Sequence, residues 1–85
     1  MSRNKGGIIV KISENVKIFR TKSGFSQQEL AKRVGVTQQM IFAIENGYKV
    51  PSVAVLIAMS DTLNTTPNDI LGYVKKEVTE WFGWQ

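Results

Sequence analysis

Residues 26–47 read SQQELAKRVGVTQQMIFAIENG and show the pattern of two short helices joined by a tight turn. Ser26 and Glu29 have the three-residue spacing of a capping box, which marks a helix start. Gly35 follows the first helix, where a departing chain often needs a positive φ angle. Thr37 is a suitable cap for the second helix, and Gly47 is placed to end it. A pair of helices around a turn that contains glycine indicates a helix-turn-helix.

The same spacing of residues extends beyond this stretch on both sides without a gap. It comprises Arg20, Gln27, Leu30-Ala31, Gly35-Val36, Thr37-Gln38-Gln39, Ile44-Glu45-Asn46-Gly47, Pro51-Ser52 and Leu63. In these residues the segment from Ile12 to Leu71 resembles the phage-repressor and Cro family, also called XRE-like regulators. Its Thr-Gln-Gln opening is most similar to that of certain lambdoid phage repressors. The resemblance implies a sequence-specific, double-stranded DNA-binding regulator of transcription.

The whole chain is expected to be all-α, as a five-helix orthogonal bundle of the lambda-repressor-like type. Residues 1–11 are expected to form a flexible or extended arm, residues 12–72 the helix-turn-helix domain, and residues 73–85 a helical, aromatic extension. Ser13 is the expected cap of the first helix, and Ser52 and Thr66 are the expected caps of the fourth and fifth. Further helices are predicted at 27–34, 38–46 and 53–63. A fifth helix is predicted to begin at Thr66-Pro67-Asn68-Asp69. The spacing of Val74, Val78 and Trp81 predicts an extended or additional C-terminal helix.

Composition narrows the classes of function. The 85 residues include no Cys and no His, so the usual transition-metal ligands and the usual general base at neutral pH are missing. There is also no Gly-rich phosphate loop and no cluster of carboxylates. We therefore expect no metal, no cofactor and no enzymatic activity.

Charge and hydropathy bear on the binding partner and on the cellular location. Residues 1–49 hold nine Lys or Arg and three Glu, whereas residues 50–85 hold two Lys and four acidic residues. The basic part contains the helix-turn-helix and therefore suits a polyanion such as DNA, although ordinary solubility would also explain the charge. No stretch approaches the ~18 apolar residues of a membrane span. We expect a cytoplasmic, nucleoid-associated protein without a membrane partner.

The second helix of the pair is expected to enter the major groove. A glutamine amide donates and accepts together, which matches N6 and N7 of adenine. We therefore expect Gln38 to read an adenine and Gln39 the adjacent base pair, and the resemblance supports both. Ala43 is placed to touch a thymine methyl group. Phe42 either presses on a thymine methyl or a sugar, or covers the helix without contacting DNA.

Phosphate contacts are expected on either side of this reading helix. Gln27 begins the first helix of the pair, where backbone N–H groups and the helix dipole favour an anion. The resemblance supports Gln27 and Asn46 in this role. The other candidates are Thr37, Tyr48 and Lys49.

The resemblance also implies an ion pair between Arg20 and Glu45, which would hold the reading helix against the scaffold. The alternative is two independent surface charges, which contribute ~0–1 kcal/mol even when paired.

The family usually binds two-fold operators as dimers, so a homodimeric repressor is expected. The inner side of the helix at 53–63 is expected to comprise Val53, Leu56, Met59, Ser60 and Leu63. Its other side is apolar as well, and the C-terminus is aromatic, so both are candidates for the dimer surface. The candidate interface residues are Val55, Ala58, Val78, Trp81, Phe82 and Trp84. Alternatively the tail caps its own core, or the chain is an antitoxin-type module that binds a protein partner through its aromatic C-terminus while retaining DNA binding.

Overall fold

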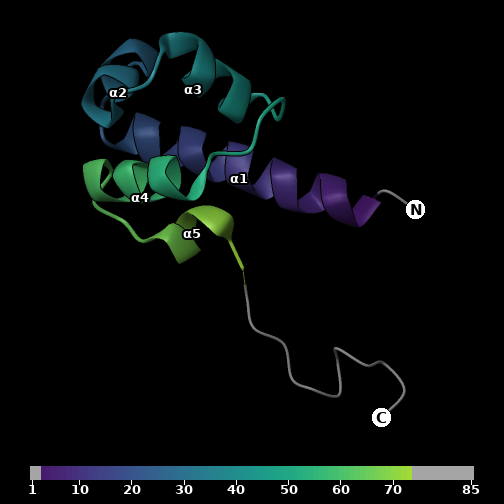
Figure 1. Ribbon diagram of the computed structural model, residues 1–85. Helices are drawn as coiled ribbons and strands as arrows, with labels where there is room; N and C mark the ends of the chain where they lie inside the picture. Colours follow the sequence, from purple (N-terminus) through teal and green to yellow (C-terminus); the bar gives the residue numbers. More distant parts are fainter. Residues whose placement is uncertain (1–2, 74–85) are drawn as a thin grey trace, which may run out of the picture.

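Five α-helices joined by short loops make up the part of the chain that the structure describes. The computed structural model describes the backbone of residues 3–73 and the side chains of residues 11–73. Figure 1 shows the helices in chain order. They are α1 (Arg3–Lys22), α2 (Gln27–Val34), α3 (Gln38–Glu45), α4 (Val53–Thr62) and α5 (Pro67–Leu71). The prediction of an all-α, five-helix fold is confirmed.

Short polar side chains begin four of these helices. The Ser26 hydroxyl accepts from the backbone N–H of Glu29 at 3.0 Å, and the Glu29 carboxylate accepts from that of Ser26 at 3.0 Å. This is the capping box that the spacing predicted. Gly35 then ends α2 with φ of 88°, a conformation that costs glycine little. The other predicted caps are also present: Thr37 on α3, Ser52 on α4 and Thr66 on α5.

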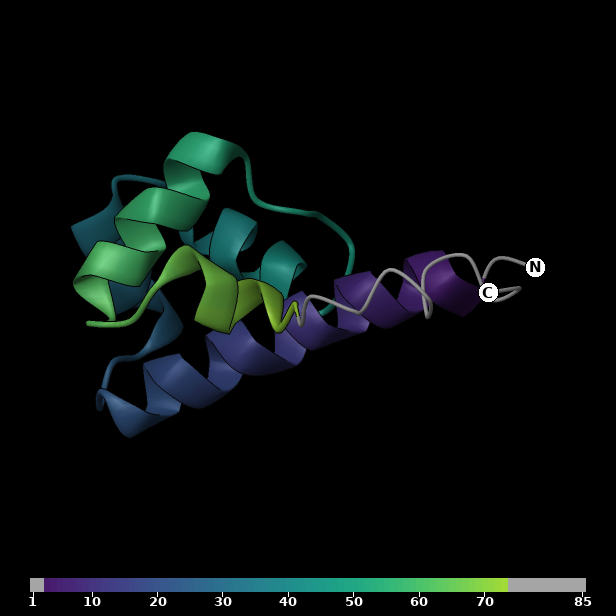
Figure 2. The same ribbon diagram turned by 90° about the horizontal axis from the view of Figure 1, so that it is seen from below.

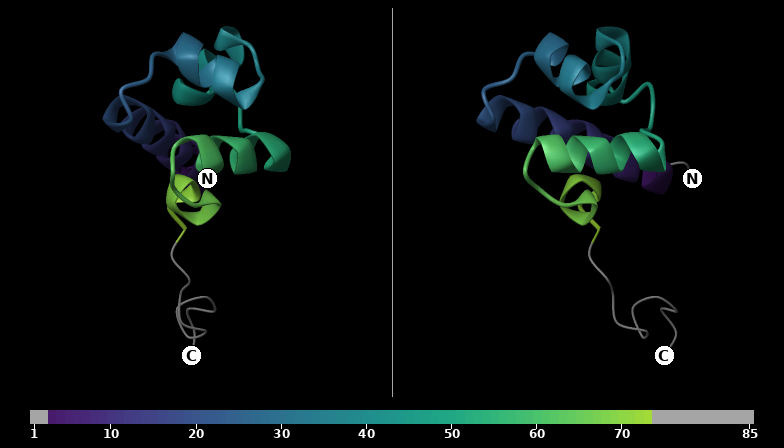
Figure 3. Two further views of the ribbon diagram at one scale, coloured as in Figure 1. Left: turned by 90° about the vertical axis from the view of Figure 1, so that its left-hand side faces the viewer. Right: turned by 60° about the vertical axis from the view of Figure 1, so that its left-hand side comes forward.

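All five helices contribute to one apolar core. α1 contacts α3 and α5, α2 contacts α3 and α4, and α4 contacts α5. Burial stabilises the fold by about 1.5–3 kcal/mol for each large apolar side chain. The buried set is Ile12, Val16, Leu30, Ala31, Ile41, Ile44, Met59, Leu63 and Ile70. In the two views of Figure 3, α2 and α3 lie together on one side of the bundle and α5 lies on the other.

The first helix begins earlier than the sequence analysis predicted. α1 is helical from Arg3, where a flexible or extended arm over residues 1–11 was expected. Ser13 lies within the helix and is 6% exposed, so it is not the cap. Extending an existing helix costs less than nucleating a new one, and there is no proline between Arg3 and Lys22. Figure 2 shows the N-terminal turns of α1 projecting beyond the other helices.

The orientation of α4 corrects two further predictions. Val53 was expected on the inner face but is 74% exposed. Val55 was expected on the outer side but packs against the core. At 3.6 residues per turn, Val55 is on the same side as Met59, four residues later, whereas Val53 is six residues away and faces solvent. A helix that is apolar nearly all round gives no periodic signal that selects one face.

An amide side chain joins the end of α5 to α1. Asn15 Nδ2 donates to the backbone oxygens of Ile70 at 3.0 Å and Asp69 at 3.3 Å. Gly72 then ends α5 with φ of 67°, and a Cβ atom there would lie 3.0 Å from the same Asn15 nitrogen. The predicted aromatic extension lies outside the described residues after Tyr73, and so do four candidate interface residues: Val78, Trp81, Phe82 and Trp84.

Candidate nucleic-acid interface

α3 has one buried side and one side that faces solvent. Ile41 and Ile44 are fully buried and attach the helix to the core. Gln38 and Gln39 form its first turn and are exposed. Phe42, one turn further on, is 49% exposed. Ala43 is half-buried, so its methyl group is less accessible than predicted.

Four of the side chains singled out from the sequence meet at one place. Gln27, Gln38, Gln39 and Phe42 line a shallow hollow of about 260 Å³, called here the reading hollow. Gln27 contributes from the start of α2, and the other three come from α3. The structure therefore joins three of the predicted base-reading residues with one predicted phosphate contact, and leaves Ala43 out.

The ion pair expected between Arg20 and Glu45 is present and nearly buried. Arg20 Nε lies 2.5 Å from Glu45 Oε2, and Arg20 Nη2 donates to Glu45 Oε1 at 3.0 Å. Their side chains are only 12% and 2% exposed. Arg20 Nη1 also donates to the backbone oxygen of Phe25 at 2.8 Å. This two-pronged geometry fixes orientation as well as distance, so it positions the end of α3 against α1.

Sequence reasoning missed the hydrogen bond that connects Gln27 to this pair. Gln27 Nε2 donates to Glu45 Oε1 at 3.0 Å, although the two residues are 18 apart in the chain. The bond ties the start of α2 to the end of α3. No pattern of neighbouring residues in the sequence predicts such a contact, because it depends on how two helices pack. The side chain expected at a phosphate therefore also braces the reading helix.

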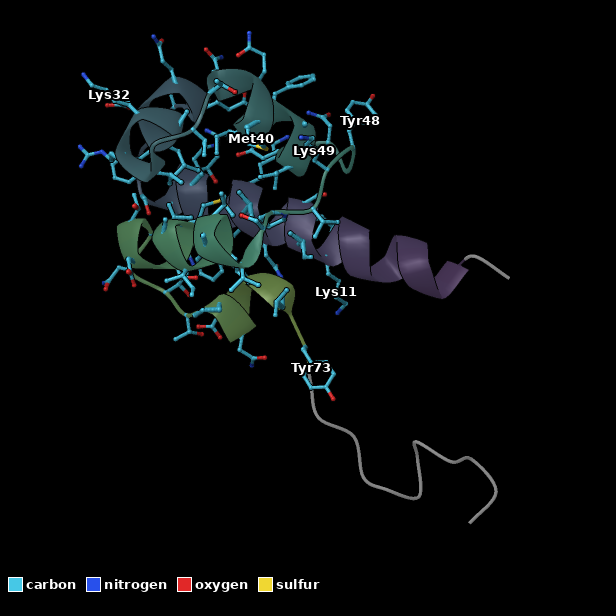
Figure 4. The ribbon with its side chains drawn as sticks, viewed as in Figure 1. Lys11, Lys32, Met40, Tyr48, Lys49 and Tyr73 are labelled. Atoms are coloured by element: carbon cyan, nitrogen blue, oxygen red, sulfur yellow. The ribbon has the colours of Figure 1, made fainter. Side chains whose placement is uncertain are left out.

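The remaining phosphate candidates are placed differently from one another. The Thr37 hydroxyl oxygen accepts from the Met40 N–H at 3.1 Å, which leaves its own O–H able to donate. Asn46 Nδ2 donates to the backbone oxygen of Phe42 at 2.8 Å. Tyr48 is 76% exposed and Lys49 is also exposed. Figure 4 shows both near the C-terminal end of α3, with the Tyr48 ring pointing away from the bundle.

The candidate dimer surface on α4 is shifted relative to the prediction. Val55 packs on the core and Ala58 is half-buried, whereas Val53 and Ile57 are exposed. These two are four residues apart and so share one side of the helix. Val50, in the loop before α4, is exposed as well. The exposed large apolar side chains of α4 and of the loop before it are therefore Val50, Val53 and Ile57.

The described residues hold neither a metal-binding cluster nor a membrane-spanning helix. They contain no group of three or more acidic, Cys or His side chains placed to hold a metal ion. None of their helices is both long and apolar enough to cross a membrane.

Known proteins share this architecture. Residues 16–70 match the helix-turn-helix family HTH_3. An HTH-type transcriptional regulator of Archaeoglobus fulgidus is 35% identical over 65 residues, which cover 76% of this chain and 92% of that protein.

Two solved structures have a similar fold. The restriction-modification controller protein C.AhdI from Aeromonas hydrophila is 24% identical with a TM-score of 0.70, and the match covers 73% of this chain and 94% of that one. A chain of the SinR protein/SinI protein complex is 27% identical with a TM-score of 0.68, and here the match covers 85% and 72%.

Proposed function

Because this chain belongs to the HTH_3 family of helix-turn-helix proteins, whose relatives are regulators of transcription, we propose that it is a dimeric repressor that reads a two-fold DNA operator. The chain is a DNA-binding regulator of the helix-turn-helix type. In the proposed complex α3 lies in the major groove, and Gln38 and Gln39 contact base edges.

The observation that carries this proposal is the exposed pair of amides at the start of a braced helix. Gln38 and Gln39 project from α3, whose far end is held by the buried Glu45 carboxylate. Base reading needs side chains that keep their position, because a hydrogen bond to a base edge is lost over a fraction of an ångström. A glutamine amide pairs with N6 and N7 of adenine, so we assign adenine to Gln38 and the adjacent pair to Gln39.

We further propose that phosphates are held by groups around α3. Thr37 offers its O–H, Asn46 its second amide N–H, and Lys49 its ammonium group. Tyr48 and Gln27 complete the set. Such contacts fix the register of the protein on DNA without reading sequence.

The dimer is proposed to form through the outer side of α4 together with residues 74–85. Val53 and Ile57 supply exposed apolar surface on α4, with Ala58 at its edge. The sequence beyond Tyr73 adds Val78, Trp81, Phe82 and Trp84. Aromatic side chains are enriched in protein interfaces. A dimer would place two copies of α3 on half-sites about 34 Å apart.

Selection of bound DNA from a random pool tests the proposal. The wild-type chain should return a motif with two inverted half-sites. The Gln38→Ala variant should lose preference at one base pair in each half-site, by about 1–3 kcal/mol of discrimination. The matched control is Gln28→Ala, which removes an exposed glutamine of α2 that does not line the reading hollow. Equal weakening on every sequence, or the same loss in both variants, would contradict base reading by Gln38.

A second candidate function is binding of a different protein through the α4 surface and the C-terminal segment. It is favoured by the similarity to a chain of the SinR protein/SinI protein complex and by the exposed Val53 and Ile57. An antitoxin-type module that retains DNA binding would fit this description. The mass of the purified chain in solution separates the two: a dimer supports the repressor, whereas a monomer that co-purifies with the product of a neighbouring gene supports the module.

A further inference from the structure

The N-terminal turns of α1 project beyond the other helices, as Figure 2 shows. They include Gly6 and Gly7, and glycine is a poorer helix former than any residue except proline. A short stretch of helix is also only marginally stable in water unless it packs against another element. Residues 3–10 therefore gain stability from a segment that lies along them.

The side of α1 that holds the end of α5 continues into these turns. Asn15 Nδ2 donates to the last turn of α5 at 3.0 Å, and a Cβ atom on Gly72 would lie 3.4 Å from Lys11 Cδ. Ile8 is seven residues before Asn15, so the two positions share one side of the helix. Gly7 is four residues before Lys11 and lies on that side as well. An apolar position and a position without a side chain therefore extend the surface on which α5 ends.

The chain leaves α5 beside this surface. Gly72 ends α5 with φ of 67°, and Tyr73 follows it directly. In Figure 4 the Lys11 side chain points to the same side of α1 as Tyr73. A helix of eight residues spans ~12 Å, so the eight residues after Tyr73 match the length of α1 from Arg3 to Val10. The segment that follows Tyr73 can therefore reach these turns within one chain.

The sequence of this segment suits such a contact. It reads VKKEVTEWFGWQ over residues 74–85. Val74, Val78 and Trp81 have the i, i+4, i+7 spacing of one helix face. An indole ring gains much by burial, and a glycine on the facing helix leaves room for it.

We propose that residues 74–82 form a helix that packs on the projecting turns of α1 in the same chain, through Val74, Val78 and Trp81 on one helix and Gly7 and Ile8 on the other. The first and last parts of the chain then form one helical pair. Phe82 and Trp84 remain for the proposed dimer surface. This inference goes beyond the proposed function and does not depend on DNA binding.

Tryptophan fluorescence of the full chain tests this inference, because Trp81 and Trp84 are the only tryptophans in the sequence. Packed indole rings emit at shorter wavelength than solvated ones and are less accessible to acrylamide. Ile8→Asp should lower the ratio of docked to undocked segment by about tenfold or more, because an apolar contact is lost and a carboxylate must leave water. At a concentration where the chain is monomeric, its emission should move to longer wavelength and quenching by acrylamide should increase.

Three further variants assign the shift to this side of α1. Val10→Asp places the same charge seven residues before the exposed Lys17, on the solvent side, and should emit like wild type. Ile57→Lys, on the proposed dimer surface, should leave the emission unchanged as well. Val78→Asp should reproduce the shift of Ile8→Asp while the cooperative thermal transition is retained, which separates undocking from loss of folding.

The inference is overturned if Ile8→Asp emits like wild type, or if Val10→Asp shifts the emission equally. It is also overturned if the wild-type emission moves to longer wavelength on dilution in step with dissociation of the dimer, because a second copy would then cover the segment.

Discussion

α3 and α4 both carry apolar side chains on their outer surfaces, but they are held in the fold by different means. Both are capped, α3 by Thr37 and α4 by Ser52, and α3 is in addition braced at its end by the buried Arg20–Glu45 pair. The first seven residues of α4 are all apolar, and Val53 and Ile57 on its outer side are 74% and 48% exposed. Hydrogen bonds and ion pairs are directional, so they fix the orientation of α3. The exposed apolar surface of α4 can instead be buried against several different partners. This difference suits α3 to reading DNA and α4 to association with another protein chain.

Breaking the brace of α3 should have the largest effect. Glu45→Gln keeps the shape of the side chain but leaves the Arg20 guanidinium without its counter-charge in a site that is 12% exposed. We expect a loss of about 3–5 kcal/mol in the free energy of unfolding, measured by urea denaturation. The control is Glu29→Gln, because glutamine also serves in a capping box. Equal stability of Glu45→Gln and wild type would show that the pair does not brace the helix.

The two sides of α4 can be separated by a matched pair of truncations. Met59→Ala removes a fully buried side chain and should cost about 2–5 kcal/mol in the free energy of unfolding. Ile57→Ala, two residues away on the exposed side, should change it by less than about 0.5 kcal/mol at a concentration where the chain is monomeric. Similar losses in the two variants would mean that the outer side is packed within the monomer.

Association through α4 is tested by a charge on its outer side. Ile57→Lys should weaken dimerisation by about tenfold or more, because an interface that buries Ile57 would have to desolvate the ammonium group. Sedimentation equilibrium measures the dimer dissociation constant. The comparison variant is Lys17→Ala, on an exposed position of α1. A dimer that survives Ile57→Lys unchanged would move the interface away from this side of α4.

The smallest effect concerns the cap of the reading helix. Thr37→Ala removes the hydroxyl that accepts from the Met40 N–H and should cost about 1 kcal/mol of stability, read from the thermal midpoint. Thr37→Ser keeps the hydroxyl and should stay near wild type. An unaltered midpoint in Thr37→Ala would indicate that packing of Ile41 and Ile44 alone sets the start of α3.

The sequence predicted best those features that depend on neighbours along the chain. The Ser26–Glu29 box and the Thr66-Pro67 start of α5 are local chemistry, so residue spacing was sufficient. The resemblance added the Arg20–Glu45 pair. The predicted start of α1 was wrong because Ser13 has the residue type of a cap but lies inside the helix, which already runs from Arg3.

Two other features could not be read from spacing. The faces of α4 were assigned incorrectly at Val53 and Val55, since the first seven residues of the helix are all apolar and give no orienting pattern. The bond from Gln27 to Glu45 joins two helices across 18 residues, and its geometry is set only by tertiary packing. The same packing creates the reading hollow. The sequence indicated each of its lining residues separately, but it did not indicate that Gln27 and Phe42 line the same hollow.

The amide of Asn15 has a practical consequence for work with this protein. It fastens the end of α5 to α1, on the side of the bundle away from α3. In Figure 4, Tyr73 lies far from the side on which Tyr48 and Lys49 project. A dye attached through a Tyr73→Cys substitution would therefore sit at the rear of the domain and keep clear of a duplex bound at the front. The sequence has no other cysteine, so position 73 is a suitable place for a label in single-molecule or imaging experiments on DNA.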